Sequence, residues 1–372
     1  MPDVTYRFDE EDRTIEVEVG DPDRPLVLLL HGTGGSKLDM VDPAAPPHTT
    51  YHGTTYENGG PDNNFDHLAP LRPGVSIGQR SYPGIGVYSC CTLDDKKDVR
   101  SWRTVLADNG FSTAVYDQVD PSGYLERPVM QLVEVMQALA KAYPSKRIVL
   151  LAHSRGGLLA RSFLKSSPRF AAPVTIVITL HSPHTGSSLA TLAVTVRDAI
   201  EGLQSVFGDV VRTALGWLLD MADSDAYREM AIGSAFLTDL AADETPLPGV
   251  EYFTFGGVSV RLTRVREWVY TLDSAIPKWQ WPPYDHTRVE TEVPVASPLA
   301  DSLPNVIEEL TEGRGDLLTA DSRTRLPFAT HQTNPINHAE ALWDPVLQAQ
   351  VLRILGVEIP SDERPDVPSF WG

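Results

Sequence analysis

Apolar runs of two kinds alternate along the central part of the chain. Residues 25–32, PLVLLLHG, form a continuous apolar run that ends in glycine, which is typical of a strand covered on both faces. Downstream, segments with the apolar spacing of helices and of strands follow one another: 98–110, 111–118, 127–143, 146–154, 156–167 and 172–183. This alternation predicts an α/β fold with a mostly parallel central sheet and helices on both faces.

Both ends of the chain extend this pattern. Alternating apolar and polar positions around the polar turn EEDR predict an N-terminal hairpin within residues 4–20. Residues 251–260 and 328–333 predict two later strands. Residues 338–356 carry apolar side chains at helical spacing and predict one closing helix, with Gly356 as its C-cap.

Three insertions interrupt the alternation within what we interpret as a single domain over residues 1–372. Residues 36–97 are rich in Pro, Gly, Asn, His and Asp and predict a long loop insertion. Apolar side chains recur every three or four positions in residues 187–222, and we interpret residues 187–248 as a helical lid or cap; the same stripe is compatible with simple packing onto the core. Residues 268–312 predict an irregular insertion.

The segment 150–160, LLAHSRGGLLA, joins a predicted strand to a predicted helix at Ser154. The small residues Ala152 and Gly156 stand two positions before and after this serine. Small neighbours let a strand and a helix meet at a tight turn, which lifts a serine hydroxyl above the sheet. The alternative is a serine that only caps the following helix. The strand–turn–helix context favours a nucleophile.

A serine nucleophile needs backbone N–H groups that face the negative charge developing on the substrate oxygen. One donor is expected from Arg155, the residue after the nucleophile, and the other from the HGTGG loop after the first buried strand, where we nominate Thr33. We expect His31 to shape this loop. A phosphate-binding loop is the rival interpretation, but Ser36 precedes Lys37, whereas that motif needs Ser or Thr after the lysine.

Together these segments resemble bacterial lipases and esterases of the α/β-hydrolase superfamily. TLHSPHTGSSLA (179–190) is similar to the family's G-S-P-H-x-G-S segment, GRGDLLTADS (313–322) to its D-G-L-V…S segment, and INHAEAL (336–342) to its N-H segment. The resemblance implies an α/β-hydrolase fold and serine hydrolysis, without indicating the substrate. It covers residues 26–35, 98–190 and 313–355.

The nucleophile, acid and histidine of this fold follow one another in that order along the chain. His331 and His338 both lie late enough, but His331 falls in the predicted last strand, and His338 matches the N-H pair of the family. The resemblance implies that Asp316 is the acid. The family pattern has glycine after this aspartate, whereas this chain has Leu317, so Asp321 stays the alternative acid.

We expect substrate contacts from His153, beside the nucleophile, and from Trp217 and Leu218 in the predicted lid. Some relatives bind calcium through an acidic residue just after the catalytic histidine, but Ala339 occupies that position here. A loose polar cluster in the first insertion lacks diagnostic metal-ligand spacing. Its members are His48, His52, Asp62, Asp66 and His67. We predict neither a metal nor a cofactor.

Composition narrows the range of partners. The formal net charge of the 372 residues is −19, which disfavours nucleic acid and anionic membrane surfaces and favours a neutral, small-molecule or lipid-like substrate. No apolar stretch approaches the roughly 20 residues that span a bilayer, so no stable membrane insertion is expected. The first residues lack a secretory signal pattern, which predicts a cytoplasmic protein unless the sequence begins after a removed signal. The adjacent Cys90 and Cys91 form no disulfide framework.

The predicted function is hydrolysis of carboxylic esters through a Ser-His-Asp triad and an acyl-enzyme. Thioester hydrolysis, amide hydrolysis and acyl transfer at the same site stay open, as does a catalytically silent protein that only binds ligands. The sequence does not indicate the length of the acyl group or the oligomeric state. It also does not indicate whether the substrate is a small molecule or a polymer.

Overall fold

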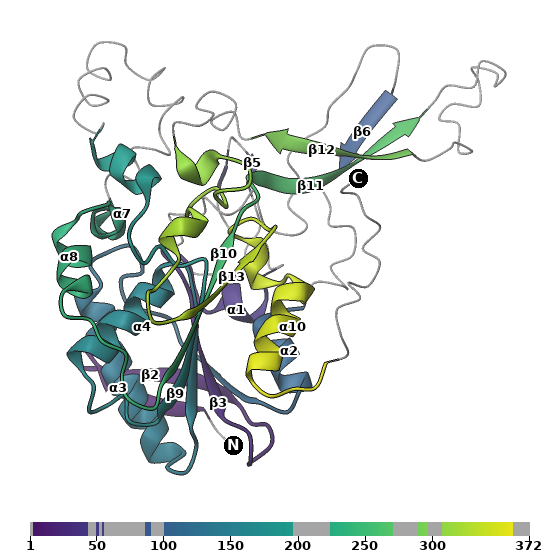
Figure 1. Cartoon of the computed structure of the whole chain (residues 1–372). Helices are drawn as coiled ribbons and strands as arrows, with labels where there is room; N and C mark the ends of the chain where they lie inside the picture. Colours follow the sequence, from purple (N-terminus) through teal and green to yellow (C-terminus); the bar gives the residue numbers. More distant parts are fainter. Residues whose placement is uncertain are drawn as a thin grey trace.

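Figure 1 shows a twisted sheet that lies between two layers of helices. The computed structural model describes residues 3–43, 50–51, 54–55, 86–90, 100–195, 224–270, 289–296 and 307–359. No helix in these residues combines the length and the apolar character needed to cross a bilayer.

Eight strands form the central sheet in the order β1-β2-β7-β3-β8-β9-β10-β13. Their bounds are β1 Val4–Phe8, β2 Glu11–Glu18, β3 Leu26–Leu30, β7 Ser112–Val115, β8 Ile148–His153, β9 Val174–Leu180, β10 Glu251–Gly257 and β13 Thr330–Asn334. The strands from β7 to β13 pair in parallel, whereas β2 pairs antiparallel with β7 and with β1. The prediction of a mostly parallel sheet is confirmed.

The N-terminal hairpin turns at Asp9 and Glu10, whose φ angles are 50° and 63°. A two-residue turn with both φ angles positive matches the right-handed twist of its flanking strands. The turn is shorter than the polar segment EEDR suggested, because Glu11 already pairs with Phe8 in the ladder.

Helices cover both faces of the sheet, as predicted. On one face α3 contacts β1 and α4, and α4 contacts α8; on the other face α2 contacts α1 and α10 (Figure 1). The bounds are α1 Leu38–Val41, α2 Trp102–Asp108, α3 Glu126–Ala142, α4 Arg155–Ser166, α8 Ala235–Ala241 and α10 Pro345–Ile354. A further short helix, α7 (Asp225–Met230), contacts α8.

The prediction of one closing helix over residues 338–356 is wrong, because the segment is split. A turn of 3₁₀ helix, η5 (Glu340–Leu342), comes first, and α10 starts afresh at Pro345. The Asp344 carboxylate accepts the Leu347 N–H at 2.8 Å, and proline tolerates the first turn of a helix, so the pair Asp-Pro begins a new helix. Gly356 follows α10 with a φ of 79°.

The predicted insertions contain strands and helices, several of which were not predicted from the sequence. Strand β6 (Gly86–Cys90) pairs with β11 (Arg261–Tyr270), which pairs with β12 (Val289–Ala296). Strands β4 (Thr50–Tyr51) and β5 (Thr54–Thr55) form a small separate ladder. In the predicted lid, residues 188–195 and α7 are helical. Trp217, Leu218, Cys91 and the polar cluster of residues 48–67 lie outside the described residues.

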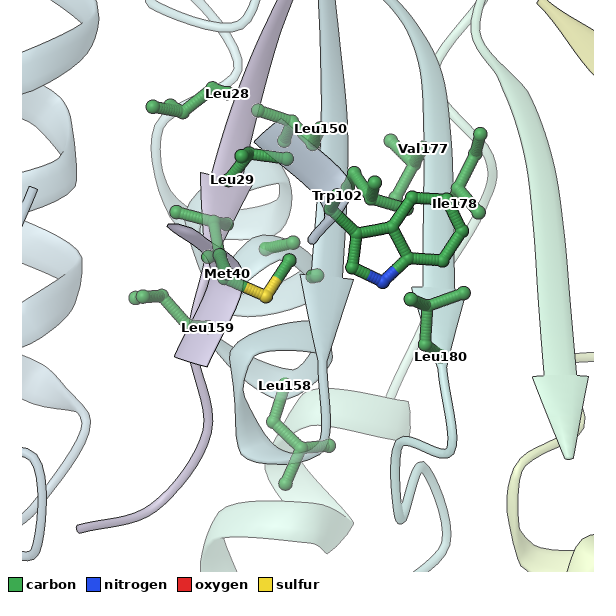
Figure 2. Packing of buried hydrophobic residues seen from close by; sticks show 14 of the residues in the cluster. Leu28, Leu29, Met40, Trp102, Leu150, Leu158, Leu159, Val177, Ile178 and Leu180 are labelled. Atoms are coloured by element: carbon green, nitrogen blue, oxygen red, sulfur yellow. The ribbon is translucent and has the colours of Figure 1, made fainter. Parts of the chain in front are cut away.

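The hydrophobic core fills the space between the sheet and both helical layers (Figure 2). Leu28, Leu150 and Val177 come from adjacent strands and are fully or almost fully buried, which is the pattern of parallel strands covered on both faces. Trp102 from α2 is also buried, and its Nε1–H donates to the Ala341 carbonyl at 2.9 Å. This bond ties the segment after His338 to the helical layer on that face.

Candidate active site

The chain passes directly from β8 into α4 through Ser154. This residue has φ 55° and ψ −131°, a conformation that L-amino acids with a Cβ rarely adopt. The Ser154 N–H donates to the Leu180 carbonyl at 2.8 Å, and its own carbonyl accepts the Gly157 N–H at 3.0 Å. A strained, hydrogen-bonded turn therefore presents the serine at the carboxyl end of the central strands.

Glycine is required at two positions around this turn. A Cβ on Gly156 would lie 2.7 Å from the carbonyl oxygens of Leu30 and His31, so only glycine lets α4 approach the end of β3 this closely. A Cβ on Gly32 would lie 2.8 Å from the Cβ of Ser154. The loop after β3 is thus packed directly against the serine.

His31 holds the shape of this loop, as expected. Its Nε2 accepts the Gln118 N–H at 3.1 Å, and its Nδ1 lies 3.0 Å from the Gly32 carbonyl. This arrangement fits a neutral imidazole with its proton on Nδ1. Burial lowers the pKa of His31, which also favours the neutral form. The Gly34 N–H donates to the Pro121 carbonyl at 3.1 Å and fixes the far side of the loop.

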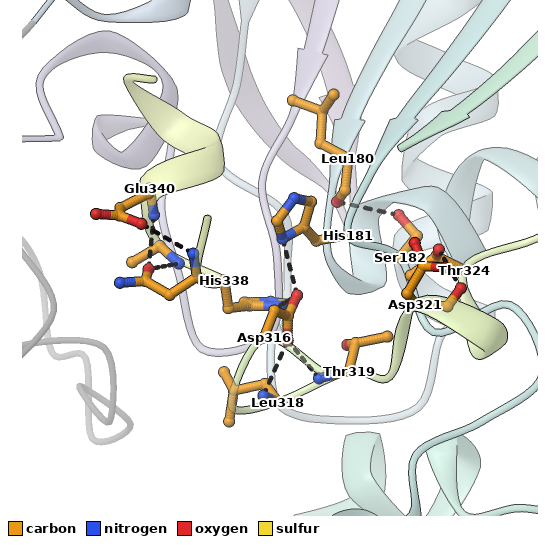
Figure 3. Close-up of polar contacts among 12 residues, drawn as sticks. Leu180, His181, Ser182, Asp316, Leu318, Thr319, Asp321, Thr324, His338 and Glu340 are labelled. Carbon is orange, nitrogen blue, oxygen red and sulfur yellow. Dashed lines mark hydrogen bonds and ion pairs between the residues drawn. The ribbon is translucent and has the colours of Figure 1, made fainter. Parts of the chain in front are cut away.

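His338 and Asp316 meet in the interior beside this turn (Figure 3). The Nδ1 atom of His338 lies 2.9 Å from Oδ2 of Asp316, and the His338 N–H donates to the Asp316 carbonyl at 2.9 Å. The other carboxylate oxygen accepts the N–H groups of Leu318 and Thr319 at 3.0 and 2.6 Å. Burial alone would raise the pKa of Asp316, but the nearby His338 and His181, together with the hydrogen bond from His338, outweigh burial and hold the pKa below its ordinary value.

Leu317 accounts for the departure from the Asp-Gly pattern noted in the sequence. Its φ is 88°, in the region that favours glycine. Its side chain is buried in the hydrophobic core, and this burial offsets the backbone strain. The loop therefore keeps the conformation that glycine would adopt, and Asp316 reaches His338.

Asp321 belongs to a different cluster. It starts the short 3₁₀ helix η4 (Asp321–Arg323), and its Oδ1 lies 3.0 Å from Nε2 of His331 and accepts the Thr333 hydroxyl at 2.8 Å. Its Oδ2 accepts from Arg325 at 2.6 Å. The structure thus brings Asp316 to His338 and Asp321 to His331, so the two sequence alternatives form two separate aspartate–histidine pairs.

A second histidine contacts Asp316. Nδ1 of His181 lies 2.8 Å from the same Oδ2 atom that faces His338 (Figure 3). Two histidines and a carboxylate are common metal ligands, and their donor atoms lie within 4.8 Å of one another. Donor atoms on one tetrahedral zinc would lie roughly 3.3 Å apart, whereas the two histidine nitrogens lie 2.8 and 2.9 Å from the carboxylate oxygen. His338 Nδ1 makes a hydrogen bond with this oxygen, whereas His181 Nδ1 has no hydrogen-bond partner among the described residues.

A narrow cavity of about 20 Å³ joins the two parts of the site. Ser154, Thr33, His153 and His338 line it together with Gly32. The Ser154 hydroxyl makes no hydrogen bond within the described residues, and Nε2 of His338 is buried and has no partner among them. Further lining side chains are Asp39, Pro183, Ser187, Tyr227, Met230, Leu318 and Thr319.

His153 lies under the site. Its Nε2 is 3.0 Å from the His338 carbonyl, and the two rings lie 4.9 Å apart. Burial, helped by the nearby His338, lowers the pKa of His153 well below its ordinary value, so His153 is neutral near pH 7. The expected substrate contact through His153 stays a prediction.

A family model described as a PGAP1-like alpha/beta domain matches residues 92–206, less than a third of the chain. The mature form of the Bacillus licheniformis lipase BlEst2 is similar in structure over 92% of this chain and 97% of that chain, with 17% sequence identity and a TM-score of 0.51. A metagenomic carboxyl esterase, MGS0156, matches 91% of this chain and 77% of that chain, at 13% identity and a TM-score of 0.48. No curated protein matches in sequence.

The chain has the α/β-hydrolase fold. In this α/β-hydrolase-fold protein, the expected elbow, the glycine-rich loop and the late histidine all lie at the carboxyl end of the parallel strands. That end is where open α/β sheets bind ligands.

Two features of the site were not predicted from the sequence. The Arg155 side chain is buried, donates to the Pro121 and Gly123 carbonyls, and forms an ion pair with Glu229 of α7 at 2.6 Å. It thereby joins the elbow to the helix that contributes Tyr227 and Met230 to the cavity. The second feature is the contact between His181 and Asp316. Neither contact has a local signal in the sequence, because each joins distant segments.

The strain at Ser154 gives a testable stability difference. We expect the free energy of unfolding of Ser154→Gly to exceed that of Ser154→Ala by about 1 kcal/mol, with a correspondingly higher unfolding temperature. Both variants lose the hydroxyl, but only glycine relaxes the strain of the positive φ. The control pair is Ser162→Gly and Ser162→Ala inside α4, where the order should reverse because glycine weakens a helix interior by about 1 kcal/mol. Equal stabilities for the Ser154 pair would contradict a strained turn.

The Asp321 cluster predicts that part of the stability of the protein depends on pH. Burial alone would raise its pKa, but hydrogen bonds from His331, Arg325 and Thr333 outweigh burial and lower it to about 2. A depressed carboxylate pKa stabilises the fold above pH 4 and loses that contribution as the pH falls toward 2. We expect Asp321→Asn to cost about 2 kcal/mol at pH 7 and progressively less from pH 4 to pH 2, measured by urea unfolding.

The exposed Asp239→Asn serves as the control for this substitution, with an expected change within about 0.5 kcal/mol at either pH. A loss for Asp321→Asn that is equal at pH 7 and pH 2 would show that the charge of Asp321 is not what stabilises the cluster.

Proposed function

We propose that this protein hydrolyses carboxylic esters through an acyl-enzyme on Ser154, with His338 as general base and Asp316 as its orienting acid. The observation that carries the proposal is the direction of the His338 ring. When Nδ1 of His338 carries the proton and donates it to Asp316, at 2.9 Å, the lone pair of Nε2 has no partner among the described residues. His338 and Ser154 line the same cavity. That nitrogen is the proton acceptor a serine needs.

The proposed reaction begins when His338 Nε2 takes the hydroxyl proton and Ser154 Oγ attacks the ester carbonyl. The carbonyl oxygen becomes an oxyanion, His338 returns the proton to the leaving alcohol, and the acyl group stays on Ser154. Water, deprotonated by the same nitrogen, then releases the acid. Asp316 stays ionised throughout and stabilises the imidazolium, in keeping with its lowered pKa and its two backbone N–H donors.

The N–H groups of Thr33 and Arg155 are the proposed donors to the oxyanion. Arg155 is the first residue of α4, where a helix N–H lacks an intrahelical acceptor. The Thr33 N–H donates no hydrogen bond within the described residues, while the neighbouring Gly34 N–H is held by Pro121. Losing one such donor typically slows catalysis by roughly 10²- to 10³-fold.

Entry of a substrate needs a rearrangement above Ser154. A cavity of about 20 Å³ holds about one water molecule. Tyr227 and Met230, both on α7, line it. We therefore propose that α7 belongs to the lid expected from the sequence and moves when an ester binds. The apolar side chains on this side of the cavity, Met230 and Leu318 among them, favour an acyl chain over a charged group.

A fluorophosphonate that phosphonylates activated serines tests the proposal. We expect one adduct on the Ser154 peptide, and none in Ser154→Ala, while the matched variant Ser162→Ala labels normally. The acids form a second matched pair: Asp316→Asn should lower kcat for a short activated ester by on the order of 10³- to 10⁴-fold, and Asp321→Asn should leave it within a few fold. Intact mass, peptide mapping and steady-state rates give the readouts.

Other outcomes would point elsewhere. Labelling of Ser154 with turnover of thioesters or amides, but not esters, would replace the substrate class and keep the site. Wild-type protein that stays unlabelled with and without detergent, while a control hydrolase labels, would contradict a serine nucleophile and leave a binding protein.

A further inference from the structure

We propose that the outer edge of β1, together with the groove between β1 and α3, binds the same surface of a second copy of this chain around a two-fold axis at Thr5. The two β1 strands run antiparallel across this axis and join the two sheets into one. The interface is independent of the proposed function, because none of the residues that line the groove also lines the cavity at Ser154.

Strand β1 is an edge of the central sheet, and β2 is its one partner among the described residues. The two-residue turn makes Phe8 and Glu11 a hydrogen-bonded pair, and pairs of this kind recur at every second residue of an antiparallel ladder. The backbone N–H and C=O groups of Asp3, Thr5 and Arg7 therefore point away from β2. A row of such groups is a template for another strand.

A groove of about 550 Å³ runs between this edge and α3. Its strand side carries Asp3, Thr5 and Arg7, which are all exposed, and its helix side carries the exposed Lys141. Asp3 Oδ1 accepts the Val17 N–H at 3.4 Å, while Oδ2 makes no hydrogen bond within the described residues. The groove therefore offers backbone groups and charged side chains at one surface.

Helix α3 lies alongside β1 in the opposite direction. Near the start of the helix, Arg127 forms an ion pair with Asp9, just after the end of β1, at 2.5 Å. Just after its end, Tyr143 lies close to Asp3, whose charge adds to burial in raising the pKa of the tyrosine. These two contacts align the residues of the helix with those of the strand.

The alignment places the middle of the strand level with one point of the helix. Thr5 lies two thirds of the way from Asp9 to Asp3. The point two thirds of the way from Arg127 to Tyr143 falls between residues 137 and 138. A two-fold axis through Thr5 therefore passes this point of α3 as well.

The charges on both elements are complementary about this axis. Asp3 and Arg7 lie two residues on either side of Thr5, and Glu134 and Lys141 lie equally far from the point on α3. The axis brings Asp3 opposite Arg7 of the second copy and Glu134 opposite Lys141 of the second copy, and such pairs of opposite charge favour one register. Neither Arg7 nor Lys141 has an ion-pair partner in the part of the chain that the structure describes.

Sedimentation equilibrium tests the interface. We expect wild-type protein to form dimers as its concentration rises. Glu134→Lys and Lys141→Glu each bring like charges together twice in every dimer, so each should raise the Kd of the dimer by at least about tenfold. The double variant Glu134→Lys/Lys141→Glu exchanges the charges and should return the Kd to within a few fold of wild type. The exposed Asp239→Lys, which changes the net charge as much as Glu134→Lys, is the matched control and should leave the Kd within a few fold.

A crosslink tests the strand register. Residues opposite each other in a hydrogen-bonded antiparallel pair have Cα atoms about 5.5 Å apart, a separation that a disulfide spans. Thr5→Cys should therefore form an intermolecular disulfide under mild oxidation, and peptide masses distinguish it from a bridge to Cys90 or Cys91. The exposed Asp12→Cys lies one strand farther from the axis and is the control. Thr5→Pro removes the central N–H without changing the charge, and it should abolish the dimer because edge strands tolerate proline.

Protein that stays monomeric at the highest soluble concentration would overturn the proposal. So would a dimer that withstands both charge reversals and Thr5→Pro, or a Thr5→Cys variant that crosslinks no faster than Asp12→Cys. Circular dichroism and thermal unfolding verify that the variants are folded. If a charge reversal prevents folding, the rate of crosslinking in Thr5→Cys decides the question.

Discussion

The structure depends on the close approach of three backbone segments at one end of the sheet. Gly156 of α4 lies against the carbonyls of Leu30 and His31, where any side chain would collide with main chain. This contact forces β8 and α4 to meet within one residue and leaves Ser154 in a conformation that its Cβ disfavours. Because Gly32 packs on the same serine, the glycine-rich loop is placed by the same constraint. The proposed nucleophile and oxyanion donors are thus consequences of one packing arrangement.

A buried carboxylate organises the other half of the site. Asp316 is sequestered from solvent, which is unfavourable for an ion, yet two backbone N–H groups and two histidines surround it. These contacts join the loop after η3, the end of β9 and the segment before α10. The Arg155–Glu229 ion pair plays a comparable part on the other side, where it fixes α7 against the elbow. These buried charged side chains therefore connect segments that are far apart in the sequence.

The sequence predicted those features of the structure that a local pattern of residues determines. Buried strands such as β3 and β8 show as continuous apolar runs, and the elbow shows as small residues around Ser154. The choice between Asp316 and Asp321 was not local, because it depends on the positive φ of Leu317 and on which histidine each carboxylate meets. The pair Asp344-Pro345 indicates that a new helix begins at α10. The apolar spacing of the whole segment nevertheless led to the prediction of one continuous helix. The contact of His181 with Asp316 joins segments that only the tertiary fold brings together.

The most direct test of the account is to trap the covalent intermediate that it requires. Protein mixed with a short activated ester and quenched in acid within the first turnover should gain the mass of one acyl group on the peptide that contains Ser154. The release of alcohol should show a burst equal to the concentration of active protein. An alcohol product without any acylated Ser154, under conditions that trap the intermediate of a control serine hydrolase, would contradict the central claim that this strained serine is the nucleophile.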